Sequence, residues 1–191
     1  MNNNRNTILV FLMVFLATAL FRVIPYELRA GWLGAPQFAI AVFAGSVIKE
    51  RKWAFGLPLI SMLLSDIIMQ MMHVFNPSLM PGFYSGQFIN YCIIVSLTVI
   101  GFFVSSRKPL EIGAGLLASP IVFFIISNFF VWAGNGGWHN GKTLAGMVKT
   151  YTDGLPFLKS DLLGTAVWGV VLFGIYHLVM QSKRQLATAE K

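Results

Sequence analysis

Six long apolar stretches, each bounded by charged or turn-forming residues, constrain the fold of this chain more than any other feature. The hydrocarbon core of a bilayer is about 30 Å thick, and a helix needs roughly 20 apolar residues to cross it. Because lipid offers the backbone no hydrogen-bond partners, each stretch is expected to be an α-helix. The stretches lie near residues 7–23, 35–48, 53–72, 88–104, 112–132 and 162–180.

The composition agrees with a membrane protein. Hydrophobic residues make up 56% of the chain and charged residues only 11%, and the mean hydropathy is +0.70. A soluble domain usually carries about 25% charged residues. The sequence therefore predicts an all-α, polytopic membrane protein with six transmembrane helices in one domain, residues 1–191.

The charged residues sit at the ends of the apolar stretches, where they set topology. The net charge is +7, and of the 14 basic residues 9 fall on one predicted side of the membrane and 5 on the other. The side richer in Lys and Arg is expected to be cytoplasmic, which places both termini inside. Basic residues at the ends of apolar stretches argue against nucleic acid as a partner. We expect the chain to be embedded in a lipid bilayer.

The N-terminal stretch has a second interpretation. Arg5, the apolar run after it and Ala17-Thr18-Ala19 resemble a cleavable signal peptide. The run is longer than most signal sequences, so we expect a span, but cleavage would leave five spans.

The predicted outer connections are long and rich in aromatic residues, whereas the cytoplasmic turns are short. They cover residues 24–36, 73–87 and 133–161 and include Tyr84, Trp138 and His139. Any one aromatic residue fits an interfacial belt, but the three connections together favour a lid over a cavity that opens outward. Within the third connection, residues 142–151 have apolar side chains at helical spacing. They predict a short surface helix between turns at residues 135–137 and 153–156, and this helix is either a gate or a passive interfacial element.

Asp66 is the principal ionisable residue inside a predicted span. A carboxylate at membrane depth is costly and normally faces the interior of the bundle. It lies in the outer half of the stretch 53–72, beneath the predicted outer connections. The functional interpretation is a substrate or proton site, and the structural interpretation is a carboxylate held by polar groups between helices.

Other polar residues fall at the same predicted depth and could converge with Asp66 on one pocket. Interhelical hydrogen bonding is the structural alternative for such side chains. Together with the loop residues above, they complete the predicted substrate-binding set: Asp66, Asn128, Ser65, Gln70, Asn90, Tyr84, Trp138 and His139.

Motifs for metal binding and catalysis are weak. The three histidines have no HxxxH spacing, and the single cysteine, Cys92, excludes a CxxC pair. Residues 140–143 end like a phosphate-binding loop, but the first glycine is misplaced and no strand precedes it. We therefore expect neither an enzyme nor a resident metal or cofactor.

Four stretches carry a family resemblance: residues 37–45, 58–66, 127–132 and 142–164, including Leu63-Leu64-Ser65-Asp66 and Lys142-Thr143-Leu144-Ala145-Gly146. With six spans and elaborate outer loops, the chain resembles the substrate-binding S components of energy-coupling-factor (ECF) vitamin transporters. It resembles even more closely a family of S-component-like bacterial transport proteins. One departure is Gly164-Thr165, where that family tends to have Gly-Asp.

The resemblance implies a function and partners. Such a protein captures a small, vitamin-like organic nutrient from outside the bacterial inner (cytoplasmic) membrane, and a coupling transmembrane subunit with ATPases supplies the energy. Cys92 cannot be matched to the cobalt-ligating cysteine of cobalamin-binding S components, so cobalamin is one candidate among several. Small residues such as Ala41 and Gly45 are expected to support helix packing or partner docking. The alternative function is a structural or accessory membrane subunit without a ligand.

Overall fold

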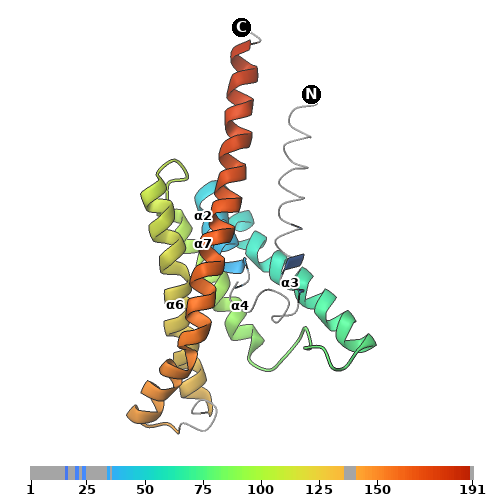
Figure 1. Cartoon of the computed structure of the whole chain (residues 1–191), viewed down its shortest axis with the longest axis vertical. Helices are drawn as coiled ribbons and strands as arrows, with labels where there is room; N and C mark the ends of the chain where they lie inside the picture. The colour runs from blue at the N-terminus through green and yellow to red at the C-terminus, as the bar shows by residue number, and fades with distance from the viewer. Residues whose placement is uncertain are drawn as a thin grey trace.

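The computed structural model describes residues 16, 20–21, 23–24, 34, 36–135 and 141–189, and its regular elements are all helices. In Figure 1, α6 and α7 lie side by side along the long axis, while α3 leaves the bundle obliquely. The helices are α2 (Gln37–Val47), α3 (Arg51–Phe75), α4 (Gln87–Ser96), α5 (Thr98–Phe102), α6 (Pro109–Asn135) and α7 (Leu144–Ala189).

Three helices are long and apolar enough to cross a membrane: α3, α6 and α7. They contain the predicted stretches 53–72, 112–132 and 162–180, while α2 and residues 87–102 form shorter apolar helices. The predicted stretch 7–23 lies almost entirely outside the described residues. The described part of the chain is therefore an all-helical protein with three potential membrane-crossing helices.

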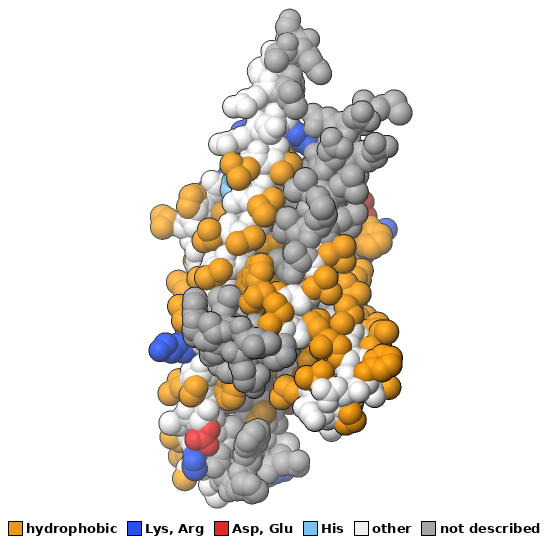
Figure 2. All heavy atoms as spheres, turned by 45° about the vertical axis from the view of Figure 1, so that its right-hand side comes forward, with side chains coloured by type: hydrophobic (Ala, Val, Ile, Leu, Met, Phe, Trp, Pro, Cys, Tyr) orange, Lys and Arg blue, Asp and Glu red, His pale blue; other side chains and the backbone are white. Residues whose placement is uncertain are grey.

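The surface of the protein is strongly apolar. Figure 2 shows hydrophobic side chains over much of the face that it presents. Soluble monomers rarely expose large contiguous apolar patches, whereas a lipid-facing surface requires them. On α3 alone, the exposed large side chains include Trp53, Ile60, Ile67, Met71, Val74 and Phe75.

Helix α2 forms the centre of the bundle. It is apolar around its whole circumference, and its residues from Gln37 to Gly45 are all buried. A helix of this kind is stable only inside a protein or a membrane. One side contributes Ile40 and Phe43 to a cluster with residues of α6 and α7, and the other packs Phe38 and Ala41 against α3 and α4.

Two glycines allow α2 and α5 to touch backbone to backbone. A Cβ atom at Gly45 would lie 2.2 Å from the Thr98 carbonyl oxygen, and one at Gly101 would lie 2.4 Å from that of Val42. Ala41 is fully buried in the same helix. The small residues of α2 therefore make contacts within the bundle. This supports the interpretation that they allow helices to pack closely.

The predicted span 88–104 is interrupted. The N–H of Leu97 donates both to Ile93 at 3.1 Å and to Ile94 at 3.2 Å, so the helix tightens there and divides into α4 and α5. The division directly precedes Thr98, whose carbonyl group lies against Gly45 of α2. The helix is thus interrupted where α5 packs closely on α2. The continuous apolar stretch 88–104 did not indicate this interruption.

The predicted turn at residues 153–156 is wrong, and so is the prediction of a separate surface helix at 142–151. Helix α7 runs without interruption from Leu144 through Pro156 to Ala189, and Figure 1 shows that its first, orange part bends away from the rest. An interior proline removes a backbone hydrogen bond and bends a helix without necessarily ending it.

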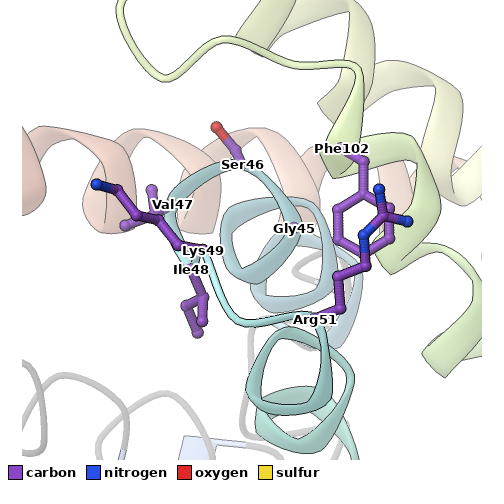
Figure 3. A pocket seen from close by; sticks show the side chains of 7 residues that line it. All are labelled: Gly45, Ser46, Val47, Ile48, Lys49, Arg51 and Phe102. Atoms are coloured by element: carbon purple, nitrogen blue, oxygen red, sulfur yellow. The ribbon is translucent and has the colours of Figure 1, made fainter.

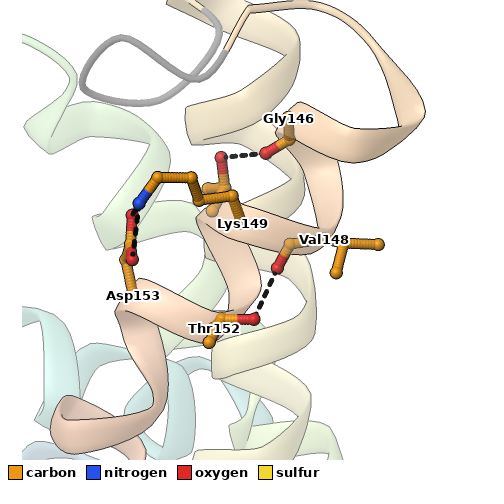
Figure 4. A network of polar contacts seen from close by, with 6 residues as sticks. Gly146, Val148, Lys149, Thr152 and Asp153 are labelled. Carbon is orange, nitrogen blue, oxygen red and sulfur yellow. Dashed lines mark hydrogen bonds and ion pairs between the residues drawn. The ribbon is translucent and has the colours of Figure 1, made fainter.

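Polar contacts stabilise the first turns of α7. The hydroxyl of Thr152 donates to the Val148 carbonyl at 2.8 Å, and Lys149 and Asp153 form an ion pair at 3.2 Å (Figure 4). Threonine bonds of this kind back to the preceding turn also favour bending. Gly154 faces α6, where a Cβ atom would lie only 2.7 Å from the Asn128 side-chain oxygen. Gly154 was predicted to belong to a turn, but in the structure it allows α7 to pack closely against α6.

Candidate functional site

Asp66 joins α3 to α4. Its side chain is fully buried, and Oδ2 accepts hydrogen bonds from Gln87 Nε2 and from the Tyr91 hydroxyl, both on α4. A buried carboxylate is tolerated only where donors of this kind replace water. These contacts favour the structural interpretation of Asp66.

The segment between α3 and α4, residues 76–86, is folded back onto α3 by two glutamines. Gln70 Oε1 accepts the N–H groups of Gly82 and Phe83 at 3.1 and 3.2 Å. Gln87 Nε2 also donates to the Gly82 carbonyl at 3.0 Å. A Cβ atom at Gly82 would lie 1.8 Å from the Asp66 carbonyl oxygen, so the segment can approach α3 this closely only with glycine.

A cavity of about 200 Å³ lies beside this network. It extends from Tyr84, which is exposed, to Gln37, which is buried at the start of α2. Asn90 Nδ2 donates to the Tyr84 hydroxyl at 2.9 Å and so fixes part of the wall. The lining residues are Gln37, Phe38, Met62, Tyr84, Asn90, Ile94, Phe123 and Asp161.

Gln37 is the unusual residue in the lining of this cavity. Only 3% of the residue is exposed, yet neither Nε2 nor Oε1 has a hydrogen-bond partner among the described residues. A buried polar group left unpaired costs about 1–3 kcal/mol. Such groups are rare in native proteins, and each one calls for a water molecule, a ligand or another partner.

The start of α2 is buried as well. Within the described part of the chain no side chain caps this helix. The N–H of Ile40 donates to the Pro36 carbonyl oxygen at 2.9 Å. A buried helix N-terminus without caps leaves several N–H groups in need of acceptors. The described lining of the cavity therefore includes the first residue of a buried helix that no described side chain caps.

The structure separates the predicted site residues. Tyr84 and Asn90 line the cavity, whereas Asp66 and Gln70 hold the segment 76–86 and α4. Trp138 and His139 lie outside the described residues.

Two further predicted residues are bonded within their own helices. Ser65 donates to the Met62 carbonyl at 2.9 Å, and Asn128 donates to the Phe124 carbonyl at 2.8 Å. Neither lines the cavity. Their positions match the interpretation in which polar side chains support helices and helix contacts.

Three important residues were not among those predicted: Gln37, Gln87 and Asp161. Gln37 is the only polar residue between Ala35 and Gly45, a signal that could have drawn attention to it. Gln87 and Asp161 fall at the edges of apolar stretches, where polar residues are common, and no comparable signal marks them.

A second hollow, of about 260 Å³, lies at the opposite end of α2. The Arg51 guanidinium carbon lies 4.8 Å from the centre of the Phe102 ring, and Figure 3 shows Lys49 pointing away from Arg51. The two cations therefore do not converge on an anion. Among the described residues no group of three or more His, Cys, Asp or Glu side chains could hold a metal, and Cys92 is exposed.

One protein family matches the chain over residues 1–188. The chain belongs to the family of unknown function DUF6580. No curated protein and no solved structure matches it. Because the DUF6580 match covers both the cavity and the Asp66 network without assigning an activity to either, a function must be argued from their geometry.

The lining of the cavity mixes polar and apolar side chains. Its described lining combines four polar side chains with four apolar ones and includes no histidine, cysteine or lysine. Small-molecule sites are typically apolar hollows in which a few polar groups fix the orientation of the ligand.

Proposed function

We propose that this protein is a substrate-binding transport subunit that captures a small organic nutrient in the cavity between Gln37 and Tyr84. The observation that carries the proposal is the cavity itself, in which the polar side chains of Tyr84, Asn90 and Asp161 stand among apolar walls. These polar groups could orient a ligand.

The size of the cavity limits the nutrient. About 200 Å³ is below the usual range of roughly 300–1,000 Å³ for small-molecule sites. A single-ring compound matches this volume, whereas a corrinoid such as cobalamin is far too large for it.

The membrane arrangement that goes with this function has six transmembrane helices. The bias of 9 basic residues against 5 supports cytoplasmic termini and an outer position for residues 76–86. The resemblance to ECF S components supports location in the bacterial inner membrane. It also supports a coupling transmembrane subunit with ATPases as the partner that energises uptake.

Native mass spectrometry of the gently purified protein tests the binding function. We expect a small molecule to be retained by the wild type and by Asn128→Ala but lost from Asn90→Ala. The two variants are matched, because both remove an amide but only Asn90 lines the cavity. Equal retention by both variants would place the ligand elsewhere.

A structural or accessory subunit without a ligand is the alternative function. The observation that favours it is that Asp66, Ser65 and Asn128 all make hydrogen bonds inside the bundle. This alternative predicts that the wild type carries no retained molecule under any mild purification. It also predicts that a candidate nutrient added at millimolar concentration leaves the melting temperature unchanged.

A further inference from the structure

We infer that a rim of basic side chains at one end of the bundle binds the headgroups of anionic phospholipids. The side chains belong to the turn between α2 and α3, the first residues of α3, and the turn between α5 and α6. This basic rim consists of Lys49, Arg51, Lys52, Arg107 and Lys108. The inference concerns the surface of the protein and is independent of the cavity and of any nutrient.

The two turns of the basic rim lie at the same end of the bundle. Helix α2 ends at Val47 and helix α5 ends at Phe102. The two helices touch at Gly45 and Gly101, less than one helical turn before these ends. The contact continues beyond the helix ends, because the Arg51 guanidinium carbon lies 4.8 Å from the centre of the Phe102 ring. The chain therefore gathers cations from two separate turns on one surface.

The basic rim carries an excess of positive charge. Two acidic side chains lie in the same stretches of the chain, and each pairs with one cation of the rim. Glu50 lies 3.6 Å from Lys52, and Glu111 lies 2.7 Å from Lys108. The remaining cations are exposed and have no acidic partner among the described residues: Lys49, Arg51 and Arg107. Three positive charges are thus left for an external anion.

The neighbours of the basic rim are apolar and exposed. Helices α3 and α6, which are long and apolar enough to cross a membrane, begin at Arg51 and Pro109. Close to the cations, Trp53 is 57% exposed, Phe103 82% and Leu110 89%. Tryptophan and long basic side chains prefer the boundary between hydrocarbon and water, where lipid phosphates lie. This neighbourhood favours a lipid headgroup over a soluble anion.

The spread of the cations also favours a membrane surface. Lys49 points away from Arg51, so the two do not clamp one phosphate (Figure 3). A layer of headgroups, in contrast, presents anions along the whole rim, and each Lys or Arg near such a layer strengthens binding by about fivefold. Arg51 packs the flat face of its guanidinium on Phe102, which leaves the N–H edge for phosphate oxygens.

Native mass spectrometry of the purified full-length protein tests the inference. The protein is incubated in detergent with equal amounts of dioleoylphosphatidylglycerol, which is anionic, and dioleoylphosphatidylcholine, which is neutral overall. We expect the bound lipid to be enriched in phosphatidylglycerol by at least about tenfold. Free glycerol 1-phosphate at millimolar concentration should not displace it, because this anion lacks the acyl chains that contact the apolar neighbours.

Neutralising the rim should remove the lipid preference. In the triple variant Lys49→Gln/Arg51→Gln/Arg107→Gln, phosphatidylglycerol and phosphatidylcholine should be retained almost equally. If this variant does not fold, Lys49→Gln/Arg107→Gln keeps the contact of Arg51 with Phe102 and should still reduce the enrichment by at least about fivefold.

A matched control removes three positive charges from the far end of α6 and the start of α7. Helix α6 has 27 residues and is about 40 Å long, so these cations lie far from the basic rim. The control variant Lys142→Gln/Lys149→Gln/Lys159→Gln should keep the enrichment of the wild type.

Three results would overturn the inference. Equal retention of both lipids by the wild type would exclude a preference for anionic headgroups and leave an acidic protein partner as the occupant of the rim. An equal loss of enrichment in the two triple variants would show an effect of net charge alone. Displacement of the lipid by glycerol 1-phosphate would indicate a site for a small soluble anion.

Discussion

Replacing Asp66 with asparagine should lower the melting temperature of the protein and leave binding in the cavity unchanged. Asp66 is fully buried and accepts hydrogen bonds from Gln87 and Tyr91, so it links α3 to α4. It does not belong to the lining of the cavity. Asparagine keeps one side-chain oxygen but replaces the other with a donor and removes the charge.

The expected loss follows from the number of bonds. A hydrogen bond to a charged group contributes about 1.5–3 kcal/mol, and the remaining oxygen of asparagine can retain roughly one of the two bonds. Asp66→Asn should therefore cost about 1.5–3 kcal/mol in the free energy of unfolding. For a chain of 191 residues, each kcal/mol shifts the melting temperature by about 2–4 °C, so the total shift is about 3–12 °C.

A double-mutant cycle measures the link directly. Thermal unfolding is followed for the wild type, Asp66→Asn, Tyr91→Phe and the double variant, each with and without a retained small molecule. Because the two side chains share a hydrogen bond, their effects should be non-additive by at least about 0.5 kcal/mol. An unchanged melting temperature together with lost ligand binding would refute the structural role and return Asp66 to the binding site.

Two further predictions concern the segment between α3 and α4. Gly82→Ala should destabilise the protein by about 1–3 kcal/mol in chemical denaturation, because the new Cβ atom would lie 1.8 Å from the Asp66 carbonyl oxygen; wild-type stability would show that the segment does not rest on α3. In a Cys92→Ser background, Ser78→Cys should react with an impermeant maleimide from outside intact cells, whereas Ser182→Cys should react only after permeabilisation. The reverse labelling pattern would contradict the proposed topology.

The long helices could be predicted from the sequence because their signals are local. Helix α3 (Arg51–Phe75) and helix α6 (Pro109–Asn135) extend the predicted stretches 53–72 and 112–132 by only a few residues at each end. Length and apolar character determine such helices. The start of α7 was mispredicted because Gly154 and Pro156 commonly form turns, whereas here Gly154 packs on Asn128 and Pro156 accompanies a bend.

The site was harder to predict because its contacts link residues far apart in the chain. The partners of Asp66 come from α4, and their positions depend on how residues 76–86 fold back onto α3. No spacing rule within one helix gives that geometry. The sequence left open whether Asp66 binds a ligand or is held by polar groups in the bundle, and the structure shows its hydrogen bonds to Gln87 and Tyr91.

Gln37 was missed for a different reason. A polar residue at the edge of an apolar run usually marks the end of a span at the membrane surface. In this protein α2 is enclosed by other helices, so its first residue is buried and not at the surface. Whether a helix terminus is buried depends on the helices that pack around it. The residues of one apolar stretch carry no information about those neighbours.

The short length of α2 has a consequence for the biogenesis of the protein. At 1.5 Å per residue, its 11 residues span only about 16 Å, roughly half of the bilayer core. A helix of this length is too short to cross a bilayer by itself. Burial of α2 requires α3, α4, α6 and α7, since its clusters draw on all four. A chain that lacks α6 and α7 is therefore expected to lack the cavity as well, because Phe123 and Asp161 belong to its lining.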